Sequence, residues 1–263
     1  NNFDNSLVGW WRGEGNANDE LGINNGALQG NANASSVGKF GTAFSFDGST
    51  GYVNTINNVG ISGIQPRTLA LWVKTNNTDY RQAIAGWGVA GTHNVFILEH
   101  SMDDSSLGNL TLITYSDDIT TPFNIANNNW HFIVATYNGT AVNVYADNTL
   151  VGSKDIPITT LDSNFEIGRQ TFEDGYGGYH YFTGSIDDVM IFNRALSVQE
   201  IASLYNATAN LYENNFTNLS IGNHTFQAYA ADSAGTKIET EERTINVVDT
   251  TIPVITLLGS NTQ

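Results

Sequence analysis

The sequence contains no cysteine, so the chain has neither disulfide bonds nor thiol chemistry. It also lacks any apolar run near the roughly 18 residues that a membrane-spanning helix requires. Basic residues are scarce: 10 Lys and Arg stand against 26 Asp and Glu, for a formal net charge of −16. Because nucleic-acid binding depends on clustered cations that neutralise phosphates, no nucleic-acid partner is expected. The acidic excess suits cation binding better.

Charged residues of both signs make up only 14% of the chain, while 40% of the residues are hydrophobic, 11% are aromatic and 26 are glycines. This composition describes a folded chain with many turns, whose polarity comes from Asn, Ser and Thr. A composition of this kind is common among extracellular β proteins, so we expect an extracellular or cell-surface location. A length of 263 residues suits one large sandwich with a smaller unit.

Apolar residues at every second position, such as Leu69, Leu71 and Val73, predict strands at Thr68–Lys74 and Ala141–Asp147. Asn138-Gly139 lies between two such strands and predicts a hairpin with a type I′ turn. Ser197 followed by Glu200 is a capping box, which predicts one short helix over Ser197–Tyr205. Many short strands separated by Gly-rich turns predict an all-β fold, an antiparallel sandwich with a single C-terminal helix.

The segment Gly184–Tyr205, GSIDDVMIFNRALSVQEIASLY, carries a family resemblance. It resembles the strand and helix that close laminin-G-like (concanavalin-A-like lectin/glucanase) jelly-roll domains. Five other segments resemble motifs of that family in the expected order: Leu7–Leu28, Lys39–Val53, Thr68–Lys74, Asn128–Ser153 and Phe165–Arg169. The resemblance implies a jelly-roll sandwich over residues 1–206, of a family whose members bind sugars, proteins or calcium.

The character of the sequence changes after residue 206. Residues 207–248 resemble part of an immunoglobulin-like module of microbial surface proteins, with strands expected at Leu211–Phe216, His224–Ala230 and Arg243–Val247. This unit has less than half of the roughly 100 residues that an immunoglobulin-like sandwich needs, so we expect it to gain strands from elsewhere. Residues 249–263 are interpreted as a linker with the first strand of a following module, or as a donor strand.

The resemblance also implies a structural calcium ion that bridges the first strands to the closing strand. Asp187 is the best carboxylate, because it lies inside an apolar strand and needs a partner. The expected ligand set is Asp187, Asp47, Gly48, Asp19 and Glu14. The alternative is that Asp187 and Asp47 bond only to turns and backbone amides. Asp188 is expected on the opposite face of the strand, in solvent.

The loop Gln170–Phe182, QTFEDGYGGYHYF, combines aromatic rings with three glycines and two carboxylates. Flat rings beside hydrogen-bonding groups suit stacking against sugar rings, and loops are where ligand choice usually resides. The candidate ligand-binding residues are Tyr176, Tyr179, His180, Tyr181, Glu173 and Asp174. The alternative is that these aromatic residues hold the loop on the sandwich or contact a protein.

No catalytic constellation is visible. Jelly-roll glycosidases place paired carboxylates on one face of a strand, whereas Glu173-Asp174 and Asp103-Asp104 are adjacent and point to opposite faces. We therefore expect no enzymatic activity. The leading interpretation is an adhesion or assembly module of a cell-surface or filament-forming protein, with structural calcium and protein partners or self-assembly. The alternative is a carbohydrate-binding module of a larger secreted protein or hydrolase.

Overall fold

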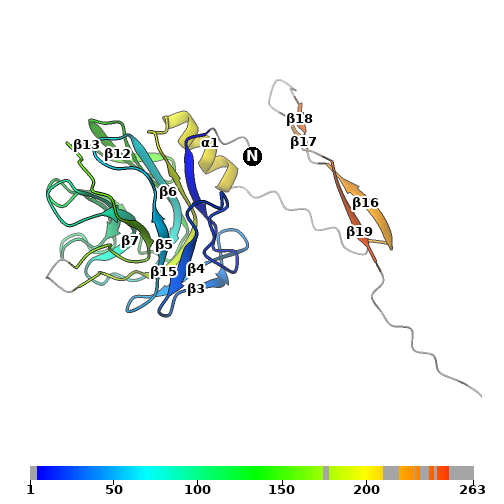
Figure 1. Cartoon of the computed structure of the whole chain (residues 1–263), viewed down its shortest axis with the longest axis horizontal. Helices are drawn as coiled ribbons and strands as arrows, with labels where there is room; N and C mark the ends of the chain where they lie inside the picture. The colour runs from blue at the N-terminus through cyan, green and yellow to red at the C-terminus, as the bar shows by residue number, and fades with distance from the viewer. Residues whose placement is uncertain are drawn as a thin grey trace, which may run out of the picture. The chain divides into compact units, whose positions relative to one another are not determined.

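The computed structural model describes residues 5–173, 178–209, 219–227, 229–231, 237–239 and 242–248 (Figure 1). The chain divides into two compact units, Asn1–Leu211 and Tyr212–Gln263. Within the described residues, no helix has the length and apolar character needed to cross a membrane. The first unit contains both candidate sites and is described first.

The first unit is built from two large antiparallel sheets, as the sequence predicts. The first sheet has the order β13-β12-β11-β6-β15-β4-β3, with β1 paired to β15. Its strands are β1 (Leu7–Trp11), β3 (Asn33–Val37), β4 (Thr42–Asp47), β6 (Arg67–Lys74), β11 (His131–Tyr137), β12 (Ala141–Ala146), β13 (Thr149–Asp155) and β15 (Thr183–Phe192). The central place of β15 explains why the closing motif is dense in apolar residues.

The second sheet has the order β10-β9-β8-β7-β14-β5-β2. Its strands are β2 (Gly26–Gln29), β5 (Tyr52–Asn58), β7 (Gln82–Gly88), β8 (Val95–His100), β9 (Asn109–Ile113), β10 (Ile119–Asn124) and β14 (Asn164–Ile167). Strands β7 to β10 pair with their neighbours along the chain, whereas β14 pairs with β5 and β7, which lie far from it in sequence. Long-range pairings of this kind hold the sandwich together.

The main core joins the two sheets, and Trp11 of β1 stacks on Phe165 of β14 with ring centroids 5.0 Å apart. Strand β6 is buried on both faces. Leu69 and Leu71 belong to the main core, whereas Ala70 and Trp72 belong to a second cluster on the other face. A strand covered on both sides has no polar face, which explains the apolar run in its sequence.

The second cluster is covered by α1 (Val198–Ala209). The capping box is confirmed: the amide of Glu200 donates to Ser197 Oγ (3.3 Å), and the amide of Ser197 donates to Glu200 Oε2 (2.8 Å). The helix continues past the predicted end at Tyr205, whose ring stacks on Trp72 at 6.0 Å. Val198 is 53% exposed, and Ile201 is the first fully buried residue of the helix face that packs on the sheet.

The predicted hairpin between β11 and β12 is present, but its turn is not of type I′. Only Gly139 has a positive φ (+99°), and the backbone bond closes the turn from Asn138 N to Ala141 O. Asn138 therefore occupies the first position of the turn instead of a central one. Its side-chain oxygen accepts from the amides of Thr140 and Ala141, the usual role of Asn at that position.

The second unit contains two short antiparallel pairs among its described residues. Strand β16 (Gly222–Phe226) pairs with β19 (Arg243–Val247), and β17 (Tyr229–Ala231) pairs with β18 (Lys237–Glu239). The predicted strand Leu211–Phe216 and the linker or donor segment 249–263 lie outside the described residues. An immunoglobulin-like module completed by other strands stays a prediction.

Expressed alone, residues 207–263 are expected to show no cooperative thermal transition. Two-stranded pairs are marginal in water, because they bury too little apolar surface to offset a backbone entropy cost of about 1–2 kcal/mol per residue. Circular dichroism melts of the monomeric fragment check this expectation, with residues 1–211 as the control that should melt sharply. A sharp melt of the fragment would show that the unit is self-sufficient.

Candidate functional site

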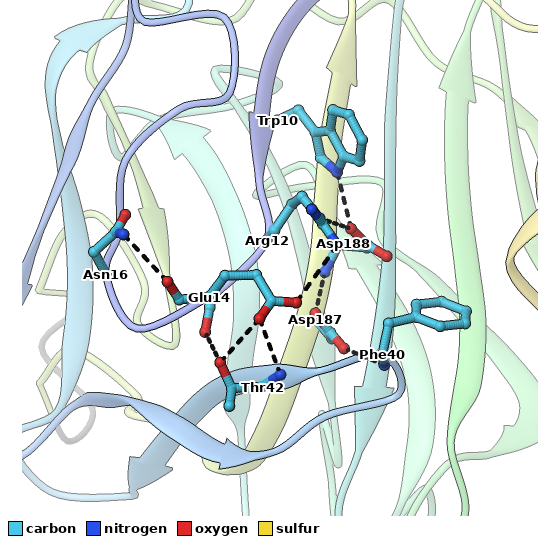
Figure 2. A network of polar contacts seen from close by, with 9 residues as sticks. Trp10, Arg12, Glu14, Asn16, Phe40, Thr42, Asp187 and Asp188 are labelled. Atoms are coloured by element: carbon cyan, nitrogen blue, oxygen red, sulfur yellow. Dashed lines mark hydrogen bonds and ion pairs between the residues drawn. The ribbon is translucent and has the colours of Figure 1, made fainter. Parts of the chain in front are cut away.

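The predicted metal ligand Asp187 lies in the middle of β15 and is 1% exposed (Figure 2). Its Oδ2 accepts from the backbone amide of Phe40 (3.0 Å), and its Oδ1 accepts from the amide of Asp188 (2.8 Å). Among the described residues no cationic side chain pairs with it. Burial, together with repulsion from Asp188, raises the pKa of Asp187 to about 7.

Asp188 is also buried, at 5% exposed, so the expectation that it faces solvent is wrong. A break in strand geometry, with φ +46° at Asp188 and a shift in the pairing of β15 with β6, places Asp188 on the same face as Asp187, and side chains of β1 and of the residue after it cover that face. The Oδ1 of Asp188 accepts from Trp10 Nε1 (2.9 Å) and lies 3.5 Å from Arg12 Nε. Burial raises the pKa of Asp188, and the indole and guanidinium contacts oppose that rise.

Glu14 lies in the same polar network (Figure 2). One carboxylate oxygen lies 3.5 Å from Arg12, and the other accepts from the amide (3.2 Å) and hydroxyl (3.3 Å) of Thr42. Arg12 therefore lies between two carboxylates, those of Glu14 and Asp188, and compensates both. Asp187 is the member of this acidic group that has only backbone partners in the part of the chain described.

Asp47 and Asp19 do not join this group. Asp47 pairs with Thr183, four residues before Asp187 on β15, and a strand rises about 3.3 Å per residue. The Asp47 carboxylate accepts from the amides of Ser49, Thr50 and Gly51 and from the side chain of Asn31. Although burial alone would raise it, these bonds hold the pKa of Asp47 well below its usual range. Gly48, with φ +75°, supplies the turn.

Asp19 stabilises its own loop in a similar way, accepting from the amides of Trp10, Leu21, Ile23 and Asn24. The five expected calcium ligands are thus not gathered at one point. Within the described residues no group of three or more acidic or histidine side chains is arranged to hold a metal ion. Calcium binding stays a prediction, and of its five expected ligands Asp187 and Glu14 lie in the network of Figure 2.

The aromatic residues of the loop Gln170–Phe182 fall into two groups. Phe172 and Phe182 are buried, at 9% and 0% exposed, and hold the loop on the sandwich. Tyr179, His180 and Tyr181 are half-buried, and Glu173 is exposed. The other two candidates, Tyr176 and Asp174, lie outside the described residues.

Tyr179 and Tyr181 lie together, with ring centroids 6.4 Å apart, and Tyr52 of β5 lies 6.2 Å from Tyr181. His180 points elsewhere and packs against the exposed Tyr80 at 6.4 Å. The backbone holds this segment beside the end of β14, since Gln170 N donates to Tyr179 O and Phe182 N donates to Gly168 O. The structure therefore assembles three half-buried tyrosines from two distant parts of the chain.

Arg169 organises these rings. Its guanidinium carbon lies 3.5 Å from the centre of the Tyr52 ring and 4.3 Å from that of Tyr179. Its Nε and terminal nitrogen donate to the two oxygens of Glu166 at 2.7 and 2.6 Å. Burial opposes the charge on Arg169, but the bonds to Glu166 and Tyr181 outweigh it and raise the arginine pKa. We call Tyr52, Tyr179, Tyr181 and Arg169 the tyrosine cluster.

Two members of the tyrosine cluster were not among the residues that the sequence singled out. Tyr52 is the penultimate residue of the segment Lys39–Val53, and Arg169 ends Phe165–Arg169, so both lie in motifs that define the fold. One signal was available for Tyr52: it precedes Val53, which is fully buried, so alternation places the tyrosine on the outer face of β5. Nothing in the sequence indicates that this face meets the loop.

A second buried network lies under the same loop. Glu99 of β8 is fully buried, its Oε2 lies 3.3 Å from Arg81 Nε, and Arg81 also donates to Gln170 (3.2 Å). Burial raises the pKa of both Glu99 and Glu166, and an arginine beside each opposes the rise. The two carboxylates lie on opposite sides of β7, across from Ala83 and Gly86. Each is therefore a separate structural ion pair.

Comparisons with known proteins agree on the fold. A sequence model of the concanavalin A-like lectin/glucanases superfamily matches residues 47–202. Comparison with curated proteins by sequence found no match. Domain 4 of AbnA, an extracellular arabinanase from Geobacillus stearothermophilus, in complex with arabinotriose, has a TM-score of 0.59 and 19% identity, covering 76% of this chain and 98% of that one.

Botulinum neurotoxin binding domains are similar as well. That of neurotoxin DC, in complex with SialylT, has a TM-score of 0.59 and 16% identity, covering 78% of this chain and 52% of that one. The receptor-binding domain of the C/D mosaic serotype has a TM-score of 0.60 and 16% identity, covering 94% and 63%. The chain thus spans about half to two thirds of these neurotoxin chains. Identities this low show a shared β-sandwich fold.

Proposed function

The chain belongs to the concanavalin A-like lectin/glucanases superfamily, and we propose that its sandwich unit is a carbohydrate-binding domain without catalytic activity. The observation that carries the proposal is the tyrosine cluster, in which three half-buried rings are held in place by one arginine. Half-buried rings present flat apolar faces for sugar C–H groups, and their hydroxyls exchange hydrogen bonds with sugar hydroxyls.

The pre-organisation of these rings supports a binding role. Two buried phenylalanines, Phe172 and Phe182, hold the loop, so Tyr179 and Tyr181 are not needed for that purpose. Arg169 fixes the orientation of Tyr52 and Tyr179, so a ligand would meet rings whose conformational entropy is already reduced. Similar structures point the same way, since the arabinanase domain was solved with arabinotriose and a neurotoxin binding domain with SialylT.

The absence of catalysis is part of the proposal. A glycosidase needs an acid and a second carboxylate on either side of one bond, about 5–9.5 Å apart depending on mechanism. The two carboxylates of the second sheet with raised pKa values, Glu99 and Glu166, each bond to a separate arginine. A carboxylate held in an ion pair is a poor proton donor or nucleophile, so these residues are better explained as structural.

Adhesion or assembly through protein contacts, with structural calcium, was the leading interpretation of the sequence and stays a prediction. We place carbohydrate binding ahead of it because the tyrosine cluster offers a defined ligand surface. An extracellular location also belongs to the proposal. It is supported by the extracellular arabinanase among the similar structures.

Replacing Tyr179 and Tyr181 together by alanine is expected to weaken glycan binding about 10- to 100-fold. Two ring contacts of about 0.5–1.5 kcal/mol each beyond simple burial account for this loss. Glycan-array retention followed by calorimetry on the best ligand measures it. Leu150→Ala, which removes a 51% exposed apolar side chain from β13 of the other sheet, is the control and should bind like the wild type.

Thermal melts of the same variants show whether Tyr179 and Tyr181 serve ligand binding or the packing of the core. We expect the double variant to melt within a few degrees of the wild type, since both rings are half exposed. A large drop in melting temperature would mean that the rings are part of the core. Unchanged glycan affinity with an unchanged melt would place the binding site elsewhere.

A further inference from the structure

The tyrosine cluster contains one cation, Arg169, and that cation is fully engaged. Both ring faces next to it belong to tyrosines, with centres 3.5 and 4.3 Å from the guanidinium carbon. Along one edge, two of its nitrogens donate to Glu166 in a bidentate pair. Tyr181 also bonds to this side chain. An incoming carboxylate would therefore have to displace Glu166 to reach the donors that suit it best.

We infer that the tyrosine cluster selects uncharged glycans over acidic ones, and that Glu166 sets this selectivity. The inference rests on the carbohydrate-binding function proposed above and specifies its ligand class. Glu166 is 6% exposed and lies in β14 between two paired strands, so it is not free to swing into solvent when a ligand arrives. The Glu166 carboxylate therefore occupies the donors of Arg169 with which the carboxylate of an acidic sugar would pair.

The surrounding charges reinforce this selectivity. Glu173 adds an exposed negative charge to the same loop. The positive charge of Arg81, under the loop, is paired with Glu99 and is therefore not available to an acidic ligand. The chain as a whole carries a formal charge of −16. A sialic or uronic acid would approach a surface of its own sign, whereas an uncharged sugar would meet no such repulsion.

Because Arg169 is already paired, the groups of the tyrosine cluster that can contact a ligand are its ring faces and phenolic hydroxyls. Both are suited to sugars with free hydroxyls and exposed C–H faces. The fold alone does not make this choice, because the similar structures include one with arabinotriose and one with SialylT. The choice follows from the bidentate pair between Arg169 and Glu166.

An array of matched neutral and acidic oligosaccharides, the latter differing by a sialic or uronic acid, tests the inference on the whole chain. The wild type should retain neutral glycans at least tenfold better than their acidic counterparts. Glu166→Gln should raise retention of acidic glycans about tenfold, because it frees the charge of Arg169. Glu20→Gln is the control: it removes the same charge from an exposed position outside the tyrosine cluster and leaves the ion pair intact, so it should leave the ratio unchanged.

Salt dependence of the wild type gives a readout that does not depend on a variant folding. Affinity for a neutral glycan should be the same at 50 and 500 mM NaCl, whereas an ion pair with an acidic ligand would weaken. Wild-type preference for acidic glycans, or Glu166→Gln that folds without changing the ratio, would overturn the inference and leave the proposed function standing. If no glycan is retained at all, the proposed function fails and the inference fails with it.

Discussion

Replacing Asp187 by asparagine should remove a contribution that, by itself, lowers the free energy of unfolding by about 4 kcal/mol as pH rises from about 4 to about 7 in the presence of EDTA. Burial raises the pKa of Asp187 from 3.8 to about 7, and each pKa unit corresponds to about 1.4 kcal/mol. In this range the folded state holds a proton that the unfolded chain has released. Stability is therefore full below about pH 4 and falls as pH rises through 7.

The absolute stability of Asp187→Asn at low pH should be slightly lower than that of the wild type. The Asp187 carboxyl accepts one backbone amide on each oxygen, from Phe40 and Asp188, and an asparagine offers only one oxygen. An unpaired buried amide costs about 1–3 kcal/mol. Urea unfolding at half-unit steps of pH measures both effects, and the slope against pH is the diagnostic quantity.

Calcium provides the second half of this experiment. If the ion binds at Asp187, saturating calcium should cancel the loss at neutral pH and stabilise the wild type by about 2.7 kcal/mol at 100 times Kd. Asp187→Asn should not respond. Identical melts of the wild type with EDTA and with calcium would rule out a structural ion at this position, while the pH slope would still report the buried carboxyl.

Asp47→Asn is the matched control for Asp187. Its carboxylate is satisfied by the turn that follows β4, and its pKa is depressed instead of raised. A depressed pKa gives stability that is present above the unfolded value of about 3.9 and lost only at lower pH. The slope between pH 4 and 8 should therefore match that of the wild type. A flattened slope in Asp47→Asn would show that the two aspartates are coupled.

Local sequence patterns were sufficient to predict much of the fold. Alternation located β6 and β12, the capping box located the start of α1, and the ordered motifs located the sandwich. These signals succeed because the side-chain alternation of a strand and the N-capping of a helix are decided within a few residues. The turn at Asn138 was misassigned by one position, since the positive φ belongs to Gly139 alone.

The candidate sites were harder to predict, because they depend on pairing between distant strands. Tyr52 meets Arg169 only because β5 pairs with β14, which places Asn54 opposite Glu166. Asp188 was assigned to solvent on the assumption of unbroken alternation. The irregularity in β15 reverses that assignment, and no residue pattern in the strand announces it.

His100 is the second buried titratable group whose replacement should have a large effect. It lies on β8, fully buried, with its ring edge-on to Phe182 at 5.9 Å and its Nδ1 2.9 Å from Ser101 Oγ. No described residue forms a hydrogen bond with its Nε2. Burial lowers the pKa of His100 from 6.5 to about 4, so the folded state excludes the imidazolium.

A histidine with a lowered pKa makes stability depend on pH in the opposite direction to Asp187. Between about pH 6.5 and pH 4 the unfolded chain binds a proton that the folded chain does not, so His100 by itself lowers the free energy of unfolding by about 3 kcal/mol as pH decreases. His100→Phe should abolish this loss, because phenylalanine fits an apolar site and does not titrate. His224→Phe, a change in the second unit, is the control and should leave the loss in place.

The two effects act in opposite directions over the same pH range, so the wild type should show a nearly flat stability between about pH 4 and 6.5 and a decline only above it. Each single variant should expose the slope of the other group: His100→Phe should fall steadily from pH 4 to 8, and Asp187→Asn should rise from pH 4 to 6.5. The residues lie in different sheets, so their effects should add. A double variant with a residual slope of 1 kcal/mol per pH unit would show that a third buried group dominates the titration.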